Sequence, residues 1–540
     1  MNEQSKTKEP RLIVGVMVLM ISNIIVKVIG VLFKIPLHNL LGDAGMGYFN
    51  AAYSVFTTLY LISTSGLPTA ISMIVSKSRV QGRKKQVNKV FTTALLIFVV
   101  IGTLGSCLMF FGSSVIADMM GSPGAAKSIS VIAPTLLLIS IASSIRGYFQ
   151  GHQNMVPTAV SEIIESIGKF AIGVALGVYA LDSGKPIEIA AAYAIFGVVV
   201  GEAVGMTFLV VFKAVYKQDY SYTNLEDDGV TESRKSILAS LFRISVPIML
   251  ASVVLNLTST IDAFSIVNLL KKVIGQEAAE AAYGNYTTLA VTLFHLPATL
   301  VTPISTSLVP ALSAANTQGS DNKIRVLLKA STKLVAIISI PCAMGLSILA
   351  KPILSILFSN AESVENAGIL LTLLAPAVVF SSLLTITSSI LQSFGYQKFP
   401  LVSMVAGVLV KIIGNLVLIS NPYLGVKGAP IATLLAYITM ATCNVLFVKK
   451  FVKHEFKIVK IYLKPLGAGI IASLVTMASY TLIHTLWGNA WYGVMASIVL
   501  TAIVYFVFLF VIRALEKNDI LFLSHGDKIY RFLNKIHLVK

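Results

Sequence analysis

The stretch "NIIVKVIGVLFKIP" (residues 23–36) is apolar enough to lie in a membrane, yet it contains two lysines, Lys27 and Lys34. The apolar run begins at Leu12, so it exceeds the roughly 20 residues that a helix needs to cross a bilayer. Lys27 and Lys34 are seven residues apart, and Asn23 precedes Lys27 by four, so all three share one helical face. An ionised group in a spanning helix costs roughly 2.5–3.5 kcal/mol unless it faces protein or water. We expect this polar face to line an internal cavity; for Lys34, the alternative is an ammonium that reaches the headgroups.

The composition extends this interpretation to the whole chain. Its 540 residues are 56% hydrophobic and 12% charged, with a mean hydropathy of +0.82, whereas soluble domains are about 25% charged. The apolar runs are continuous rather than alternating, which favours an all-α polytopic membrane protein over a barrel. We expect fourteen transmembrane helices, at 12–36, 46–76, 90–117, 127–149, 157–181, 187–213, 237–270, 281–312, 326–357, 365–393, 400–420, 427–448, 461–485 and 491–513.

The net charge of +18 is distributed unevenly along the chain. If both termini are cytoplasmic, the cytoplasmic segments carry most of the basic residues: six in 77–89, five in 213–243, four in 323–333, six in 449–464 and six from 513 onward. The opposite loops carry about five in total. This asymmetry follows the positive-inside rule. The excess charge then faces anionic membrane lipids, and we do not expect nucleic acid as a partner.

Weak internal repeats predict the domain organisation. Tyr, Asn and Pro recur at a shift of 235, and an Ala-Pro pair and a Gln recur at a shift of 242: Tyr48 with Tyr283, Asn50 with Asn285, Pro68 with Pro303, Ala133-Pro134 with Ala375-Pro376, and Gln150 with Gln392. Even numbers of crossings per half predict two lobes related by a pseudo-two-fold axis along the membrane normal. We expect an N-terminal six-helix lobe (1–213), a cytoplasmic linker (214–236), a C-terminal six-helix lobe (237–450), helices 13 and 14 (451–513) and an amphipathic cytoplasmic tail (514–540).

Further charged residues lie inside the predicted helices. In "SEIIESIGK", Glu162, Glu165 and Lys169 share one face, and Glu165 and Lys169 could also form a self-neutralising pair that only packs. Lys411 occupies the matching position of the second half. Lysines around a cavity attract an anion, and phosphate is the leading candidate. The predicted substrate-binding residues are Asn23, Lys27, Lys34, Glu165, Lys169 and Lys411.

Acidic and oxygen-bearing residues suggest ion coupling. Asp262 lies near Asn256, and with Glu162 these residues could bind Na⁺ or a proton, although a hydrogen-bonded structural Asp fits equally well. Three scattered cysteines predict neither a metal site nor a disulfide framework. There is no P-loop motif and no catalytic constellation. The sequence therefore predicts a non-enzyme without cofactors, driven by an ion gradient, the membrane potential or substrate flow.

Three stretches carry a family resemblance: "GVLFKIPLHNLLGDAGMGYFNAAY", "STSGLPTAIS" and "IRGYFQGHQNMVPTAVSEIIESIGK". They resemble the polysaccharide-biosynthesis transporters of the MOP superfamily, in the branch of MurJ-like lipid II flippases and stage V sporulation protein B. The resemblance covers essentially the whole chain, and "RGYFQG" is its most specific part. It implies a V-shaped cavity between two lobes, alternating access, and the bacterial cytoplasmic membrane as the location.

The resemblance also implies a substrate. An undecaprenyl-pyrophosphate-linked sugar would move from the inner to the outer leaflet, with lipid II first among the expected substrates and cell-wall synthesis proteins as partners. In such proteins, cavity cations, mainly Arg, serve the pyrophosphate; here Lys stands at positions 27, 34 and 169. Lys is a point charge without the planar fork of Arg. Glu162 stands where the resemblance leads us to expect Gln.

Other functions remain open on the sequence. A MATE-type multidrug or cation antiporter would bind organic cations at its central acids, but the cationic face and the two extra helices argue against it. A flippase for another envelope polysaccharide precursor fits the same residues. A non-transporting scaffold of envelope assembly would need no internal charges.

Overall fold

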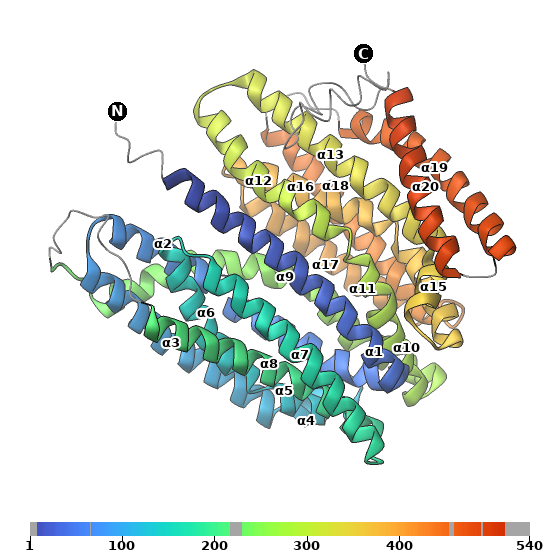
Figure 1. Ribbon diagram of the computed structural model, residues 1–540, viewed down its shortest axis with the longest axis horizontal. Coiled ribbons are helices and arrows are strands. Elements are labelled where there is room, and N and C mark those ends of the chain that lie inside the picture. The colour runs from blue at the N-terminus through green and yellow to red at the C-terminus, as the bar shows by residue number, and fades with distance from the viewer. Residues whose placement is uncertain (1–7, 65, 217–228, 453–457, 488–489, 513–540) are drawn as a thin grey trace. The chain divides into compact units, whose positions relative to one another are not determined.

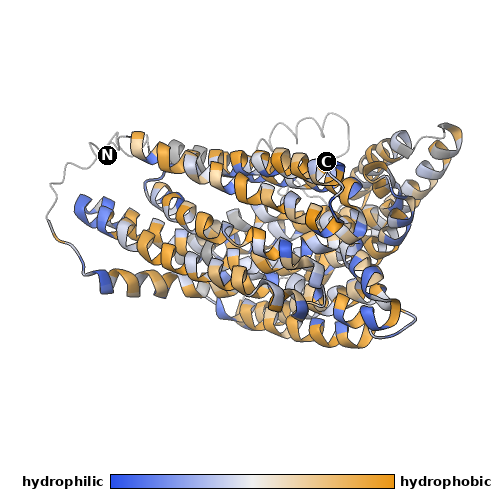
Figure 2. Cartoon of the chain, turned by 90° about the horizontal axis from the view of Figure 1, so that it is seen from below, coloured by the Kyte–Doolittle hydropathy of each residue, from blue (hydrophilic) through white to orange (hydrophobic). Residues whose placement is uncertain are grey.

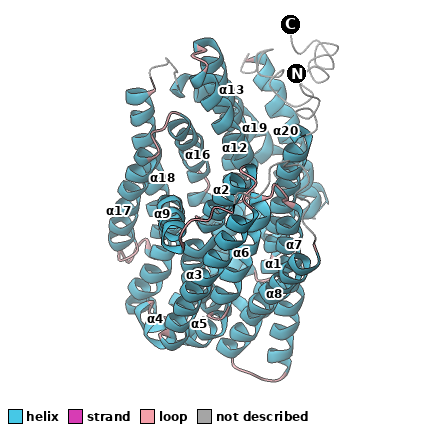
Figure 3. Ribbon diagram, turned by 90° about the vertical axis from the view of Figure 1, so that its left-hand side faces the viewer, coloured by secondary structure: helices cyan, strands magenta, loops and turns pink. Residues whose placement is uncertain are grey.

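The computed structural model describes residues 8–64, 66–216, 229–452, 458–487 and 490–512. Within these ranges every regular element is a helix (Figure 3). Apolar residues run along most of the helices, and hydrophilic residues gather at several helix ends (Figure 2). The described chain forms two compact units, Met1–Gly284 and Asn285–Lys540.

Eleven of the described helices are long and apolar enough to cross a membrane, or thirteen if two bent helix pairs each form one span. The all-α polytopic class is thereby confirmed. One of the eleven lies within α1 (Lys8–Thr64), which is itself two helices joined at Gly42. That span, Ile21–Leu61, covers both parts. The number fourteen stays a prediction.

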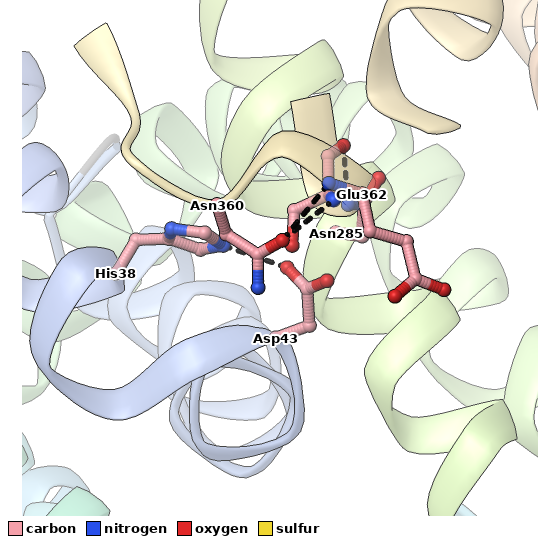
Figure 4. A network of polar contacts seen from close by, with 6 residues as sticks. His38, Asp43, Asn285, Asn360 and Glu362 are labelled. Carbon is pink, nitrogen blue, oxygen red and sulfur yellow. Dashed lines mark hydrogen bonds and ion pairs between the residues drawn. The ribbon is translucent and has the colours of Figure 1, made fainter. Parts of the chain in front are cut away.

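The break in α1 has a local cause. Gly42 has φ 67° and ψ −176°, a conformation that glycine adopts without strain. His38 precedes the break and Asp43 follows it, and their side chains meet at 2.6 Å between Nε2 and Oδ1 (Figure 4). His38 is buried. The contact therefore connects the two parts of α1 across the break.

The first unit continues with α2 (Leu67–Val80), α3 (Lys84–Phe111), α4 (Ser113–Met119), the 3₁₀ turn η2 (Pro123–Ala125), α5 (Ala126–Ile132), α6 (Thr135–Gly151), α7 (Val156–Asp182), α8 (Ile187–Val215), α9 (Arg234–Ile274) and α10 (Gln276–Asn285) (Figure 1). Its hydrophobic core joins α2, α3, α6, α8 and α9. Because α9 packs along α1, α2 and α3, this unit ends later in the chain than the predicted linker. The predicted lobe limits, 1–213 and 237–450, follow the repeat and stay predictions.

The second unit contains η3 (Tyr286–Ala290), α11 (Val291–Phe294), α12 (Ala298–Thr317), α13 (Asp321–Ile348), α14 (Ala350–Leu357), α15 (Ala361–Leu374), α16 (Ala377–Ser393), α17 (Lys398–Leu418), η4 (Gly425–Lys427), α18 (Gly428–Phe451), α19 (Ile458–Trp487) and α20 (Ala490–Val511). Asn360 caps α15 by accepting from the backbone N–H groups of Glu362 and Ser363. The Asn285 amide donates to the Ser363 carbonyl at 2.8 Å (Figure 4). These bonds fix the start of α15.

The two Ala-Pro pairs of the sequence repeat have matching local structures. Ala133-Pro134 separates α5 from α6, and Ala375-Pro376 separates α15 from α16. The two prolines have nearly the same backbone angles, φ −58° with ψ −22° and −26°. Proline cannot donate a helical hydrogen bond, and the second pair of helices is bent by 44°. The repeat thus corresponds to a helix break at an Ala-Pro pair in each unit, and only the second of these two breaks bends its span by more than 40°.

The two extra helices, α19 and α20, pack against each other and α19 packs on α13. Two hydroxyl pairs join α19 to α20, Thr476–Thr501 at 2.6 Å and Ser479–Ser497 at 3.1 Å. Such hydrogen bonds are typical of helix pairs in membranes. The predicted tail (514–540) and much of the predicted linker lie outside the described residues.

Candidate functional site

The polar face of α1 lies on the surface of the first unit. Ser22 is buried and its hydroxyl donates to the Ala159 carbonyl of α7 at 2.9 Å. The next turns leave Asn23 and Lys27 exposed, together with apolar neighbours such as Val28. α1 therefore packs on α7 through one face and leaves the predicted polar residues accessible.

Two of the predicted cations converge in the first unit. Lys34 is partly buried, and the positive charge of Lys169 on α7 repels the Lys34 ammonium. The Lys169 ammonium lies 5.6 Å from the ring centroids of both Phe33 and Tyr53. No carboxylate or hydrogen-bond acceptor contacts this ammonium in the described chain, so its contacts are cation–π contacts.

Tyr53 belongs to an aromatic stripe on the second part of α1. Its members follow helical spacing with consecutive ring centroids 5.7–5.9 Å apart: Phe49, Tyr53, Phe56 and Tyr60. The stripe leads from the Lys169 ammonium to the charged cluster described next, because the charges nearest Tyr60 include Glu165 and Arg146.

Arg146 forms the centre of this buried cluster. It is 6% exposed on α6, and its guanidinium donates to Ser161 Oγ and to Glu165 Oε2, each at 3.2 Å. In the sequence, "RGYFQG" carries the family resemblance, and no role is predicted for Arg146. The available signal was a single arginine inside the apolar run "IASSIRGYFQ".

This geometry corrects the alternative in which Glu165 and Lys169 neutralise each other. In the described chain Glu165 pairs with Arg146, while Lys169 lies over two rings. Glu162, predicted to take part in ion coupling, is also a charged neighbour of Arg146.

α8 approaches this cluster unusually closely because of glycines. A Cβ at Gly197 would lie 2.3 Å from the Gly173 backbone, and one at Gly201 would lie 2.6 Å from the Glu165 carbonyl oxygen. Glycines four residues apart let membrane helices pack backbone to backbone. The contact brings Glu202 of α8, which is 1% exposed, next to Glu165.

Lys411 occupies a different environment in the second unit. It is 0% exposed, and its ammonium donates to the Ala429 carbonyl at 3.2 Å and to the Thr433 hydroxyl, both on α18. The Thr433 hydroxyl also contacts Tyr286 Oη at 3.2 Å. The structure therefore places Lys411 in helix packing between α17 and α18 of the second unit.

Asp262 and Asn256 lie on α9, in the first unit. The Asn256 amide donates to the Thr58 hydroxyl at 3.1 Å, and Thr58 contacts the Thr260 hydroxyl at 2.7 Å. Asp262 is 6% exposed, with Tyr283 as an electrostatic neighbour. The polar set thus joins α1, α9 and α10, whereas Glu162 belongs to the Arg146 cluster. No group of three or more metal-ligating side chains occurs among the described residues.

Comparisons with known proteins agree with this architecture. The family model described as polysaccharide biosynthesis protein matches residues 12–316, and the MatE model matches residues 247–417. The chain is 26% identical over 464 residues to lipid II flippase MurJ of Bacillus subtilis, covering 83% of this chain and 84% of the relative. It is 24% identical over 511 residues to stage V sporulation protein B of the same organism, covering 94% and 96%.

Solved structures show the same fold. A lipid II flippase MurJ structure in an inward closed conformation matches with a TM-score of 0.70 at 16% identity, covering 91% of this chain and 98% of that one. An inward-facing multidrug resistance MATE family transporter matches with a TM-score of 0.64 at 16% identity, covering 80% and 98%. The family match, the relatives and the spans together place the chain in the polysaccharide biosynthesis protein family, as a multi-span membrane transporter of the MOP superfamily in the branch of MurJ and stage V sporulation protein B.

Proposed function

We propose that this protein is a flippase that moves an undecaprenyl-pyrophosphate-linked sugar, with lipid II as the first substrate to test, from the inner to the outer leaflet of the bacterial cytoplasmic membrane. Both termini would be cytoplasmic, as the charge asymmetry predicts. The two lobes would expose the headgroup site alternately to each side. The similarity to MurJ supports the substrate class, and the cations of the first unit support the chemistry.

The observation that carries the proposal is the pair Lys34 and Lys169. Two like charges close together in apolar helices are stabilised by a bound anion. Among the described residues, the Lys169 ammonium lies over two aromatic rings, and such contacts are worth about 0.5–2 kcal/mol. A phosphate oxygen would offer a charge-assisted hydrogen bond worth about 1.5–3 kcal/mol. A diphosphate headgroup would therefore compete successfully for Lys169, while Asn23 and Lys27 remain accessible on the same face of α1. We leave Lys411 out of the headgroup site because its ammonium is bonded within helix packing.

The second unit offers a place for a polyprenyl tail. A cavity of about 650 Å³ lies between α13, α16 and α19, and its walls are almost entirely apolar, including Ile340, Phe380 and Leu466. A long hydrocarbon chain gains free energy in proportion to the apolar surface that it buries. The polyprenyl tail would lie in this cavity against α19, the first of the two extra helices.

A complementation experiment tests the proposal. The chain would be expressed in a bacterium whose own lipid II flippase can be depleted, with growth and outer-leaflet exposure of lipid II as readouts. We expect the wild type to restore both. Lys34→Gln and Lys169→Gln should lose restoration at equal membrane levels, whereas Lys127→Gln, at an exposed position of α5, should retain it. Failure of the wild type despite normal insertion would exclude lipid II and favour another envelope precursor.

A MATE-type cation antiporter is the second candidate. The MatE match to residues 247–417 and the buried acids Asp262 and Glu202 favour it. Such an antiporter would protect cells from cationic drugs, and Asp262→Asn would abolish that protection while Lys169→Gln would not. The flippase proposal predicts instead that Lys169→Gln abolishes the restored growth.

A further inference from the structure

The side chain of Glu202 is buried in the first unit without a donor. It is 1% exposed on α8, and no N–H or O–H group of the described chain donates to either carboxyl oxygen. The group that approaches it is another carboxyl, that of Glu165. Two carboxyl groups can be hydrogen-bond partners only when one of them holds a proton.

The charged and titratable groups around Glu202 come from three neighbouring elements. α7 supplies Glu165 and Glu162, α6 supplies Arg146, and Tyr60 of α1 faces the same cluster. Three other cations of the first unit are engaged elsewhere or exposed. Lys169 lies over Phe33 and Tyr53, Lys213 lies over Phe91 and Tyr148, and Lys127 of α5 is exposed.

The guanidinium of Arg146 is therefore the cation that interacts with all three carboxyl groups. Arg146 already donates to Glu165, and Glu162 is only partly buried. Glu202 is buried and has no donor among the described residues. A buried carboxylate without a partner is strongly unfavourable, and such groups take up a proton instead. Neighbouring carboxyls that cannot both ionise hold one proton between them and titrate as a pair.

We propose that Glu202 and Glu165 share one proton beside Arg146 and that this carboxyl pair is the proton-binding site of the transporter. Loss of the proton to water would leave Glu202 as a second anion that competes with Glu165 for Arg146. Because the three residues stand on α8, α7 and α6, the competition would change how these helices pack. The site thus supplies a link between pH and the conformation of the first unit, whatever the transported substrate is.

Infrared spectroscopy of the full chain in lipid nanodiscs tests the proposal directly. At pH 7 we expect a carbonyl band of a protonated carboxylic acid that disappears in Glu202→Gln and persists in Glu188→Gln, a change at an exposed position of the same helix. The band should titrate away as the pH is raised. Arg146→Gln should shift that titration to higher pH, because the cation favours the ionised form.

Three results would overturn the proposal. The first is the absence of any protonated carboxyl band in the wild type at pH 7. This result can be read even if Glu202→Gln does not fold. The second is a band that Glu202→Gln leaves unchanged. The third is loss of the band on adding Na⁺ at constant pH, which would assign the site to a metal cation. None of these results depends on which lipid is flipped.

Discussion

The ion pair between Arg146 and Glu165 gives the sharpest energetic prediction. Its side chains are 7% and 24% exposed and meet at 3.2 Å. Removing one member of a fully buried pair costs about 3–5 kcal/mol, because the other charge is left uncompensated. Glu162 and Glu202 would partly compensate Arg146 after Glu165→Gln, and Glu165 is partly solvated. We therefore expect losses of about 3 kcal/mol for Arg146→Met and about 1–2 kcal/mol for Glu165→Gln.

A double-mutant cycle isolates the pair. The free energy of unfolding would be measured by titrating a denaturing detergent into protein held in a mild one, for the wild type, both single variants and the double variant. We expect a coupling energy of about 2 kcal/mol. The control is the ion pair of Lys351 and Glu365, whose side chains are 61% and 54% exposed, and which should give less than about 1 kcal/mol. A coupling for Arg146–Glu165 no larger than that of the control would refute the claim that a buried charge pair joins α6 to α7.

Three further predictions follow from the packing and the buried polar groups. A Cβ at Gly197 would lie 2.3 Å from the Gly173 backbone, so Gly197→Leu should lower the free energy of unfolding by about 3 kcal/mol. Gly30→Ala, whose Cβ would have no atom within 4 Å, should leave the free energy of unfolding unchanged. A Gly197→Leu protein as stable as the wild type would disprove close packing of α7 on α8. Burial lowers the pKa of His152, just after α6, from 6.5 to about 4, and Arg79 and Lys213 add to the effect. The folded state therefore favours neutral His152, and stability should fall by about 2 kcal/mol between pH 7 and pH 5 relative to His152→Asn; equal pH profiles in thermal unfolding would contradict this. Lys411→Met should lower stability by about 1–3 kcal/mol, because Thr433 loses a buried donor, yet retain complementation; lost growth at normal expression would return Lys411 to the substrate site.

The sequence was sufficient for the class of fold because hydrophobic length alone defines spanning helices. It also placed Glu162, Glu165 and Lys169 on one helix correctly. It could not identify their partners, since Arg146 reaches Glu165 from a separate helix and only tertiary packing brings them together. The pattern "GVVVGEAVG", with glycines at positions 197, 201 and 205, was a readable signal for the close approach of α8.

Lys411 and Asp262 show the opposite limit. The sequence pattern of a lysine inside an apolar helix is the same whether the lysine faces a cavity or is hydrogen-bonded to a neighbouring helix. The Ala429 carbonyl and Thr433 hydroxyl decide this for Lys411, and they lie 18 and 22 residues away. Asp262 has Tyr283 of α10 as an electrostatic neighbour, and no local pattern around Asp262 reveals this.

Binding of undecaprenyl pyrophosphate to the full chain in nanodiscs tests the central claim most directly. If Lys34 and Lys169 hold the diphosphate, replacing either with Gln should weaken binding about tenfold, since each charge-assisted hydrogen bond contributes at least about 1.4 kcal/mol, and Lys127→Gln should bind as the wild type does. Equal affinities for the wild type, Lys34→Gln and Lys169→Gln would contradict the account.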